Sequence, residues 1–325
     1  MANVSDTRST ALKRTAGAVR ADHIIAEQES RQRRRRWVLL SPALIAICVF
    51  GILPLFIIVM YSFLTPGNYA GVKWEFSTDA YVQFLFERDI FDESVRVFTT
   101  DYLEIYWRSF QLAAFSTVAA LIFGFPAAYF MATRPPETRN LWVFLFTLPF
   151  WTNLLIRTYS MLIIIRDEGL VNITLQKVGI IEQPMVILFT DFAVGLGLLY
   201  SYLPFMVLPI YASLEKVDFR LVEAGFDLYA SRFRVLWRII IPLAKPGIIA
   251  GCILVFIPAL GAFITPIMLG GGKNLMIGNL ISLQFGSSRN WPFGSAAALI
   301  LMAFVMIALM FYVRTTTRGK AMGHG

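Results

Sequence analysis

The sequence predicts an all-α integral membrane protein with six transmembrane helices. Hydrophobic residues make up 57% of the 325 residues and charged residues only 15%, whereas a soluble domain is about half apolar and a quarter charged. The apolar residues form long blocks rather than a short period, which is typical of helices surrounded by lipid. Most cations gather at the ends of these blocks, where membrane topology places them.

Six apolar segments are long enough to cross a bilayer. About 20 helical residues span ~30 Å of hydrocarbon at ~1.5 Å per residue, and in lipid only a helix satisfies every backbone hydrogen bond within one segment. The predicted spans are 37–63, 110–132, 141–165, 185–208, 247–269 and 293–313, and kinks are expected at Pro54, Pro126, Pro149, Pro204 and Pro258.

Lysine and arginine clusters predict the side of each loop. They lie before span one, between spans two and three, between spans four and five, and after span six. In a six-span arrangement these positions share one side, which is cytoplasmic and holds both chain ends. The loop after span one is acidic instead. The cations are Arg31, Arg33, Arg34, Arg35 and Arg36, then Arg134 and Arg139, then Lys216, Arg220, Arg232, Arg234, Arg238 and Lys245, then Arg314, Arg318 and Lys320.

The predicted organisation is a transmembrane domain over 37–314 between two cytoplasmic tails. Residues 1–36 are polar and rich in arginine, serine and threonine, which predicts a disordered tail; residues 315–325 form the second tail. An arginine run can bind nucleic acid, but next to a first span it is more often a topology anchor. We therefore expect a lipid bilayer as partner and no nucleic acid.

The cytoplasmic segment 213–246 is charged and amphipathic. Asp218 can cap a helix beginning at the next residue, and Ser231 can cap a second helix in which apolar residues alternate with arginines. Pro242 and Pro246 are expected to end this helix before span five. The pair of helices either lies on the bilayer surface or docks onto a cytoplasmic partner.

The same segment resembles the signature loop of permease subunits in ATP-binding-cassette importers, which reads Glu-Ala-Ala, then a glycine, then Ile-x-Leu-Pro. This chain has Glu223-Ala224-Gly225, and Ile239-Ile240-Ile241-Pro242 follows at the matching distance. Gly225 replaces the second alanine. Tyr229 stands where the family has the glycine that permits the tight turn between the two helices.

The resemblance covers residues 37–314 and is closest to the first permease of spermidine/putrescine importers. Segments similar to that family are LPFWTNLLIRTY at 148–159, LPFMVLPIY at 203–211, LGGGKNLMIG at 269–278 and NWPFG at 290–294. The resemblance implies a type I importer permease fold, also called MetI-like. It implies a bacterial inner-membrane permease that moves a polyamine or related small cation.

The resemblance also implies partners. These are a second homologous permease, two ATPase subunits that hold the ATP and Mg, and an external solute-binding protein. This chain itself would carry no cofactor and no metal. The residues implied to couple it to the ATPase are Glu223, Ala224, Gly225, Asp227, Leu228, Tyr229, Ala230, Ser231 and Arg232.

Nothing in the sequence predicts catalysis on this chain. Gly270-Gly271-Gly272-Lys273 lacks the first glycine of a phosphate-binding loop and the Ser or Thr after its lysine. His23 and His324 lie in the tails, and Cys48 and Cys252 lie inside apolar runs. We therefore expect a transporter subunit and not an enzyme.

Charged residues inside spans are costly and so indicate function. Arg157 lies in span three and Asp191 near the outer end of span four. Arg157 would repel a cationic solute, so we expect it to pair with a carboxylate or to extend outward. Asp191 binds the solute, partners Arg157, or simply lies in the headgroup region. With nearby aromatic faces, which attract cations, the candidates for the substrate path are Trp151, Asn153, Tyr159, Asp191 and Tyr202.

A different class of protein stays open at this stage. A stand-alone secondary transporter or channel would carry more intramembrane charges, an inverted repeat or glycine-broken short spans. None of these features is clear in the sequence. A membrane enzyme would need a catalytic cluster of side chains, and the spans contain none.

Overall fold

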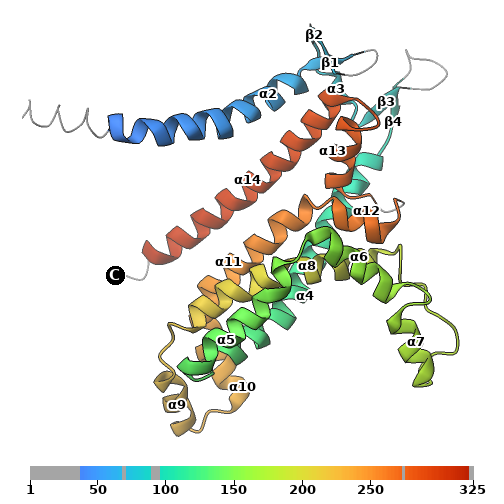
Figure 1. Cartoon of the computed structure of the whole chain (residues 1–325). Helices are drawn as coiled ribbons and strands as arrows, with labels where there is room; N and C mark the ends of the chain where they lie inside the picture. The colour runs from blue at the N-terminus through green and yellow to red at the C-terminus, as the bar shows by residue number, and fades with distance from the viewer. Residues whose placement is uncertain (1–36, 68–70, 89–95, 273–274, 322–325) are drawn as a thin grey trace, which may run out of the picture. The chain divides into compact units, whose positions relative to one another are not determined.

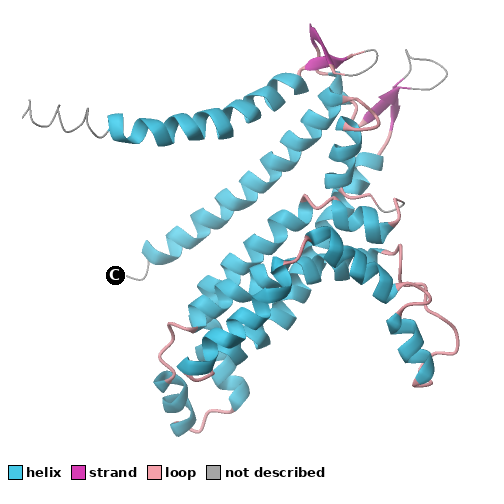
Figure 2. Ribbon diagram, viewed as in Figure 1, coloured by secondary structure: helices cyan, strands magenta, loops and turns pink. Residues whose placement is uncertain are grey.

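The computed structural model describes residues 37–67, 71–88, 96–272 and 275–321. Helices dominate these residues (Figure 2). Five of the helices described are long and apolar enough to cross a membrane, and a bent helix pair provides a sixth crossing if it counts as one span. The all-α membrane class is therefore confirmed, while the predicted tail over 1–36 lies outside the described residues. The chain divides into two compact units, with the boundary after Met60.

The first unit contains most of one helix, which is described from Trp37 to Ser62 and ends one residue before the predicted end of the first span at residue 63. A π-helical turn, η1 (Cys48–Ile52), precedes α2 (Leu53–Ser62). Pro54 is the second residue after that turn. Proline lacks an N–H and its ring clashes with the carbonyl four residues earlier, and the wider π turn accommodates it.

The centre of the second unit is a bundle of α4 (Asp101–Ala132), α8 (Asp191–Leu214) and α11 (Ile241–Leu260), which lie side by side in Figure 1. Small residues allow the close approach of these helices. A Cβ at Gly124 would meet Met206 Cγ at 3.1 Å, and one at Gly247 would clash with the carbonyl oxygen of Pro209. The bundle core includes Ala128, Met206, Val207, Ile210, Leu214 and Val255.

Two predicted spans begin at the wrong residue. The second helix starts at Asp101 rather than at residue 110, because its polar first turns fall below the hydropathy of a span. The fourth starts at Asp191 rather than at 185. Thr190 caps α8 by accepting a hydrogen bond from the Ala193 N–H at 3.2 Å, so the preceding apolar residues are not helical.

The third span is broken, and the predicted continuous helix over 141–165 is wrong. It consists of α5 (Pro136–Thr147), the 3₁₀ turn η2 (Leu148–Trp151) and α6 (Leu154–Ile165), followed by α7 (Leu170–Lys177). The two halves meet at 88°. Pro149 removes one backbone donor, and extended residues at 152–153 end the helical path.

The fifth span also differs from the prediction. α10 (Arg232–Val235), the π turn η3 (Leu236–Ile240) and α11 run without interruption into the bundle. Pro242 and Pro246 do not end the helix, because the π turn that ends at Ile240 repeats the arrangement seen at Pro54. The helix instead ends at Leu260 with Gly261 as its C-cap, and α12 (Ile264–Gly270) is a separate element. The span predicted over 247–269 is therefore two helices.

Short elements surround the end of the bundle near α13 (Ile277–Phe285) and the start of α14 (Trp291–Ala321). Antiparallel pairs β1 (Leu64–Pro66) with β2 (Val72–Phe76), and β3 (Phe86–Arg88) with β4 (Arg96–Phe98), flank α3 (Asp79–Val82). The sequence did not predict these strands. Phe293 joins the region to α14, with ring centroids 4.8 Å from both Phe84 and Tyr102.

Candidate coupling loop and candidate transport path

The segment 213–246, predicted to be cytoplasmic, contains two short helices. The carboxylate of Asp218 accepts a hydrogen bond from the Arg220 N–H at 3.0 Å, and α9 (Arg220–Asp227) begins one residue later than predicted. The Ser231 hydroxyl accepts from the Arg234 N–H at 3.4 Å at the start of α10. The two predicted helices are therefore present, and the second continues into span five.

Tyr229 occupies the turn between these helices in a left-handed conformation, with φ of +57°. The Tyr229 N–H donates to the Phe226 carbonyl at 2.9 Å, and the Ala230 N–H donates to the Gly225 carbonyl at 3.1 Å. These two bonds form a Schellman motif, whose left-handed residue is usually glycine. The turn thus keeps its usual geometry, and the tyrosine bears a backbone strain of about 1–2 kcal/mol.

Gly225 is the contact point between α9 and the start of the fifth span. A Cβ at this position would lie 2.9 Å from Ile239 Cδ1 and 3.4 Å from Val235 Cγ2. Val222 and Val235 are buried in the same hydrophobic cluster as Leu214 of the bundle. The loop therefore packs against the bundle core through buried side chains.

The other predicted coupling residues lie on the open side of the loop. Leu228 is 82% exposed and Tyr229 is 96% exposed. Large apolar side chains that are this exposed beside charged ones are typical of an interaction surface. Ala230 is half-buried, and Glu223, Ala224, Asp227, Ser231 and Arg232 are exposed.

An ion pair ties the loop between α4 and α5 to the end of α8. Arg139 Nη1 lies 3.5 Å from Glu215 Oε1, and Nη2 donates to the carbonyls of Ala132 and Arg134. The Tyr211 hydroxyl donates to the same Glu215 oxygen at 3.1 Å. The guanidinium of Arg139 in α5 thus joins the turn before α5 to the first residues of segment 213–246.

The break in the third span sets the geometry of the candidate transport path. Asn153 Oδ1 accepts from the Leu155 N–H at 2.8 Å and caps α6. Asn153 is therefore a helix cap, although it is exposed and free to contact other groups. Trp151, at the end of the preceding turn, is 79% exposed, and Tyr159 on α6 is 55% exposed.

Arg157 lies four residues into α6 and is buried, with only 8% exposure. Its guanidinium carbon is 5.4 Å from the ring centroid of Phe150 and 5.8 Å from that of Tyr200. Tyr202 is next to this group and donates to the Pro258 carbonyl at 3.3 Å. Contrary to expectation, Arg157 neither extends outward nor pairs with a carboxylate among the described residues.

Asp191 lies apart from this aromatic group. It is exposed at the first turn of α8, and Tyr202 is ~16 Å farther along the same helix at ~1.5 Å per residue. The structure thus places Asp191 at the start of α8, away from Arg157. Asp191 is not the partner of Arg157.

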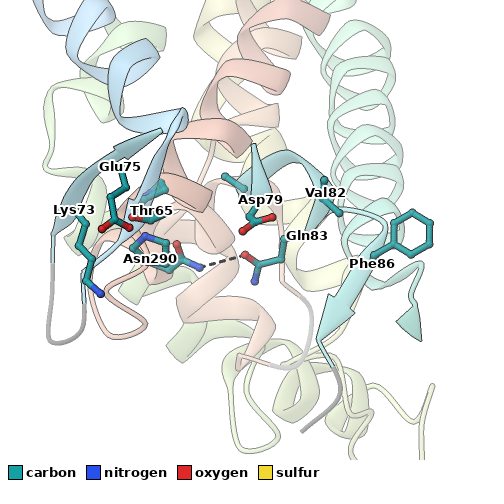
Figure 3. A pocket seen from close by; sticks show the side chains of 11 residues that line it. Thr65, Lys73, Glu75, Asp79, Val82, Gln83, Phe86 and Asn290 are labelled. Carbon is teal, nitrogen blue, oxygen red and sulfur yellow. Dashed lines mark hydrogen bonds between the residues drawn. The ribbon is translucent and has the colours of Figure 1, made fainter. Parts of the chain in front are cut away.

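A polar pocket of about 500 Å³ lies on the side predicted to be external (Figure 3). Its polar lining includes Lys73 and Glu75 from β2, Asp79 and Gln83 around α3, and Asn290 just before α14. Asn290 Nδ2 donates to Gln83 Oε1 at 3.3 Å, which ties together segments about two hundred positions apart. Sequence reasoning missed this pocket; the acidic character of the loop was the only available signal.

The glycine-rich segment is a turn. α12 ends at Gly270, and Gly271 and Gly272 are left-handed with φ of +63° and +75°. Lys273 and Asn274 lie outside the described residues. Within the described ranges, no group of three His, Cys, Asp or Glu side chains is placed to hold a metal ion.

Comparison with known proteins identifies the class that this fold defines. Residues 96–317 match the family described as binding-protein-dependent transport system inner membrane component. A solved importer of the acidic polysaccharide alginate aligns with a TM-score of 0.62 over 89% of this chain and 98% of its own, at 16% identity. That likeness shows the fold, which is that of an importer permease.

More similar relatives are named spermidine/putrescine transport system permease protein PotB. The protein from Escherichia coli is 42% identical over 268 residues, which is 82% of this chain and 93% of that protein. The protein from Haemophilus influenzae is 44% identical over 218 residues, 67% of this chain and 76% of that protein. The chain therefore belongs to the family of binding-protein-dependent inner-membrane permeases, and its resemblance to the polyamine branch is confirmed.

Family membership decides between the classes that the sequence left open. The chain is the membrane component of a transport system, not an enzyme, and the stand-alone secondary transporter or channel is set aside. The broken third span, which alone could suggest such a transporter, occurs here within an importer permease fold.

Proposed function

We propose that this chain is a permease subunit of an ATP-binding-cassette importer that moves spermidine, putrescine or a related small cationic solute inward. The observation that carries the proposal is the 42% identity to the E. coli protein PotB across 93% of that protein's length. The outer pocket contains the carboxylates of Glu75 and Asp79 beside the single cation Lys73, which gives it a net negative charge, the sign that attracts a polycation.

The proposed assembly contains a second, homologous permease. A relative named PotC from E. coli is 30% identical to this chain over 145 residues, which supports pairing between two chains of similar fold. A solute-binding protein would deliver the solute at the outer side, as the family description implies. The alginate importer has been solved with a periplasmic protein, which supports a docking face of this kind.

The cytoplasmic partner in this proposal is an ATPase, present in two copies, that holds the ATP and Mg. The exposed tip at Leu228 and Tyr229 would insert into its surface, and Glu223 and Arg232 would make polar contacts beside it. Because Val222 and Val235 share a hydrophobic cluster with Leu214, a displacement of the loop would move α8 and α11 with it. Packed side chains transmit such shifts because they cannot be compressed.

Both chain ends would face the cytoplasm, since every predicted cytoplasmic loop carries the positive charge. The substrate path would pass the broken third span, lined by Trp151, Asn153, Tyr159 and Tyr202, with Asp191 nearer its outer end. A cysteine introduced at Tyr229 should react with a membrane-impermeant thiol reagent only in inverted vesicles. Reaction in right-side-out vesicles would overturn the orientation.

The test of the proposal is uptake of radiolabelled spermidine and putrescine by proteoliposomes that contain the full transporter and its binding protein. Glu223→Ala and the double reversal Arg232→Glu/Arg234→Glu are expected to abolish ATP-dependent uptake while membrane insertion is unchanged. Glu182→Ala, at an exposed carboxylate outside the loop, is the matched control. Uptake unaffected by the loop variants would contradict the coupling role, and no uptake of either polyamine by the intact transporter would contradict the substrate.

A further inference from the structure

Arg157 is a buried charged residue for which the described chain provides no counter-charge. The residue is 8% exposed, and its Nε is fully buried with no hydrogen-bond partner. No ion pair joins it to a described carboxylate; the arginine farther along the same segment, Arg166, has one with Glu168 at 3.3 Å. A buried guanidinium without a counter-charge is strongly unfavourable.

The groups around Arg157 do not remove this cost. The rings of Phe150 and Tyr200 lie 5.4 Å and 5.8 Å from the guanidinium carbon, near the outer limit of a cation–π contact. The N-terminus of the 12-residue helix α6 lies one turn away and adds positive partial charge. Only one of its first N–H groups is capped by a side chain, by Asn153.

We propose that Arg157 and the N-terminal turn of α6 form a binding site for a carboxylate. A carboxylate matches the planar fork of a guanidinium and can accept two parallel hydrogen bonds from it. The free N–H groups at the start of α6 favour the same charge. The carboxylate comes either from a small anion in solution or from an acidic side chain of the second permease, and the second source depends on the assembly under Proposed function.

A carboxylate bound at this site would change the electrostatic potential that a cationic solute meets at the neighbouring aromatic rings. With its charge neutralised, Arg157 no longer repels a cation from the rings of Phe150, Tyr200 and Tyr202. The same rings are then available to an ammonium group. The carboxylate would act as a positioning partner of Arg157 and would itself contact no solute.

The experiment measures the thermal unfolding midpoint of the full chain in phosphatidylcholine nanodiscs, with and without the second permease. Sodium acetate is titrated against a bulky sulfonate at constant ionic strength. The chain alone should gain about 3 °C or more at saturating acetate. Arg157→Gln should remove this gain, while Arg166→Gln, which removes a half-exposed arginine farther along the segment, should retain it.

Adding the second permease distinguishes the sources. If acetate still stabilises the assembled pair, the site takes a free anion; if the acetate effect disappears on assembly, the partner supplies the carboxylate. Should Arg157→Gln fail to insert, Arg157→Lys keeps the charge without the fork and should need about tenfold more acetate. The proposal would be overturned if the chain alone showed no response to acetate. It would also be overturned if Arg157→Gln or Arg157→Lys responded to acetate as the wild type does. None of these readouts requires solute or ATP, so they remain interpretable if polyamine uptake fails.

Discussion

Gly225 of α9 and Ile239 of the π turn η3 are in direct contact within segment 213–246. A methyl group on Gly225 would approach Ile239 Cδ1 to 2.9 Å, and the next nearest atom is Val235 Cγ2 at 3.4 Å. The first of these atoms is the flexible end of a side chain, whereas the helix backbones are fixed by burial of Val222 and Val235 in the bundle core. The contact therefore tolerates one added carbon but not several.

Gly225→Ala should leave the unfolding midpoint nearly unchanged. The gain in helix propensity of about 1 kcal/mol offsets the small displacement of Ile239. Gly225→Leu should destabilise the loop by about 1–3 kcal/mol through overpacking and reduce coupled ATP hydrolysis. The measurement is thermal unfolding followed by transport-dependent ATPase activity. Equal behaviour of the two variants would show that the helices are not in contact here.

Tyr229→Gly should stabilise the turn of the loop by about 1 kcal/mol, since glycine adopts a positive φ without steric cost. The 96% exposed ring makes little contact within this chain, so its loss costs little stability. If the ring contacts the ATPase, the same variant lowers the affinity between the two. Tyr229→Ala is the control, because it removes the ring and keeps the strain. A lower midpoint for Tyr229→Gly would contradict the strained turn.

Gly247→Ala should be among the most destabilising single changes in the bundle. Its methyl group would meet the carbonyl oxygen of Pro209 and the side chain of Ser213, and a backbone atom cannot move aside without separating α8 from α11. A loss of about 1–3 kcal/mol is expected. Gly261→Ala, with no atom within 4 Å of the added carbon, should have little effect. The comparison requires only expression level and thermal unfolding in detergent.

Asn153→Ala should weaken the break in the third span by removing the cap of α6, at a cost of about 1 kcal/mol. Asn153→Asp keeps the acceptor oxygen and should retain the stability. Hydrogen exchange at the Leu155 amide, which donates to Asn153 at 2.8 Å, should rise in the first variant only. Unchanged protection in Asn153→Ala would mean that Asn153 does not hold the start of α6.

Sequence periodicity and hydropathy located the helices well where a helix has one dominant surface. The first helix ends at Ser62, within one residue of the predicted end, and the Ser231 cap is where the sequence placed it. Hydropathy failed at Pro149 and Gly261, because an apolar run with a break has the same composition as one without. It also failed at Pro242, where the π turn η3 allows the helix to continue.

The sequence by itself determined the membrane class and the charge asymmetry, because these depend on composition and on where apolar blocks and cations fall along the chain, and segment 213–246 was singled out by its resemblance to the loop of importer permeases. Only the tertiary structure decided that Tyr229 takes the left-handed turn, that Arg157 is buried without a described counter-ion, and that Asp191 lies apart from it. These outcomes depend on which side chains meet across helices distant in sequence. Burial and pairing are properties of that packing, and local sequence does not specify them.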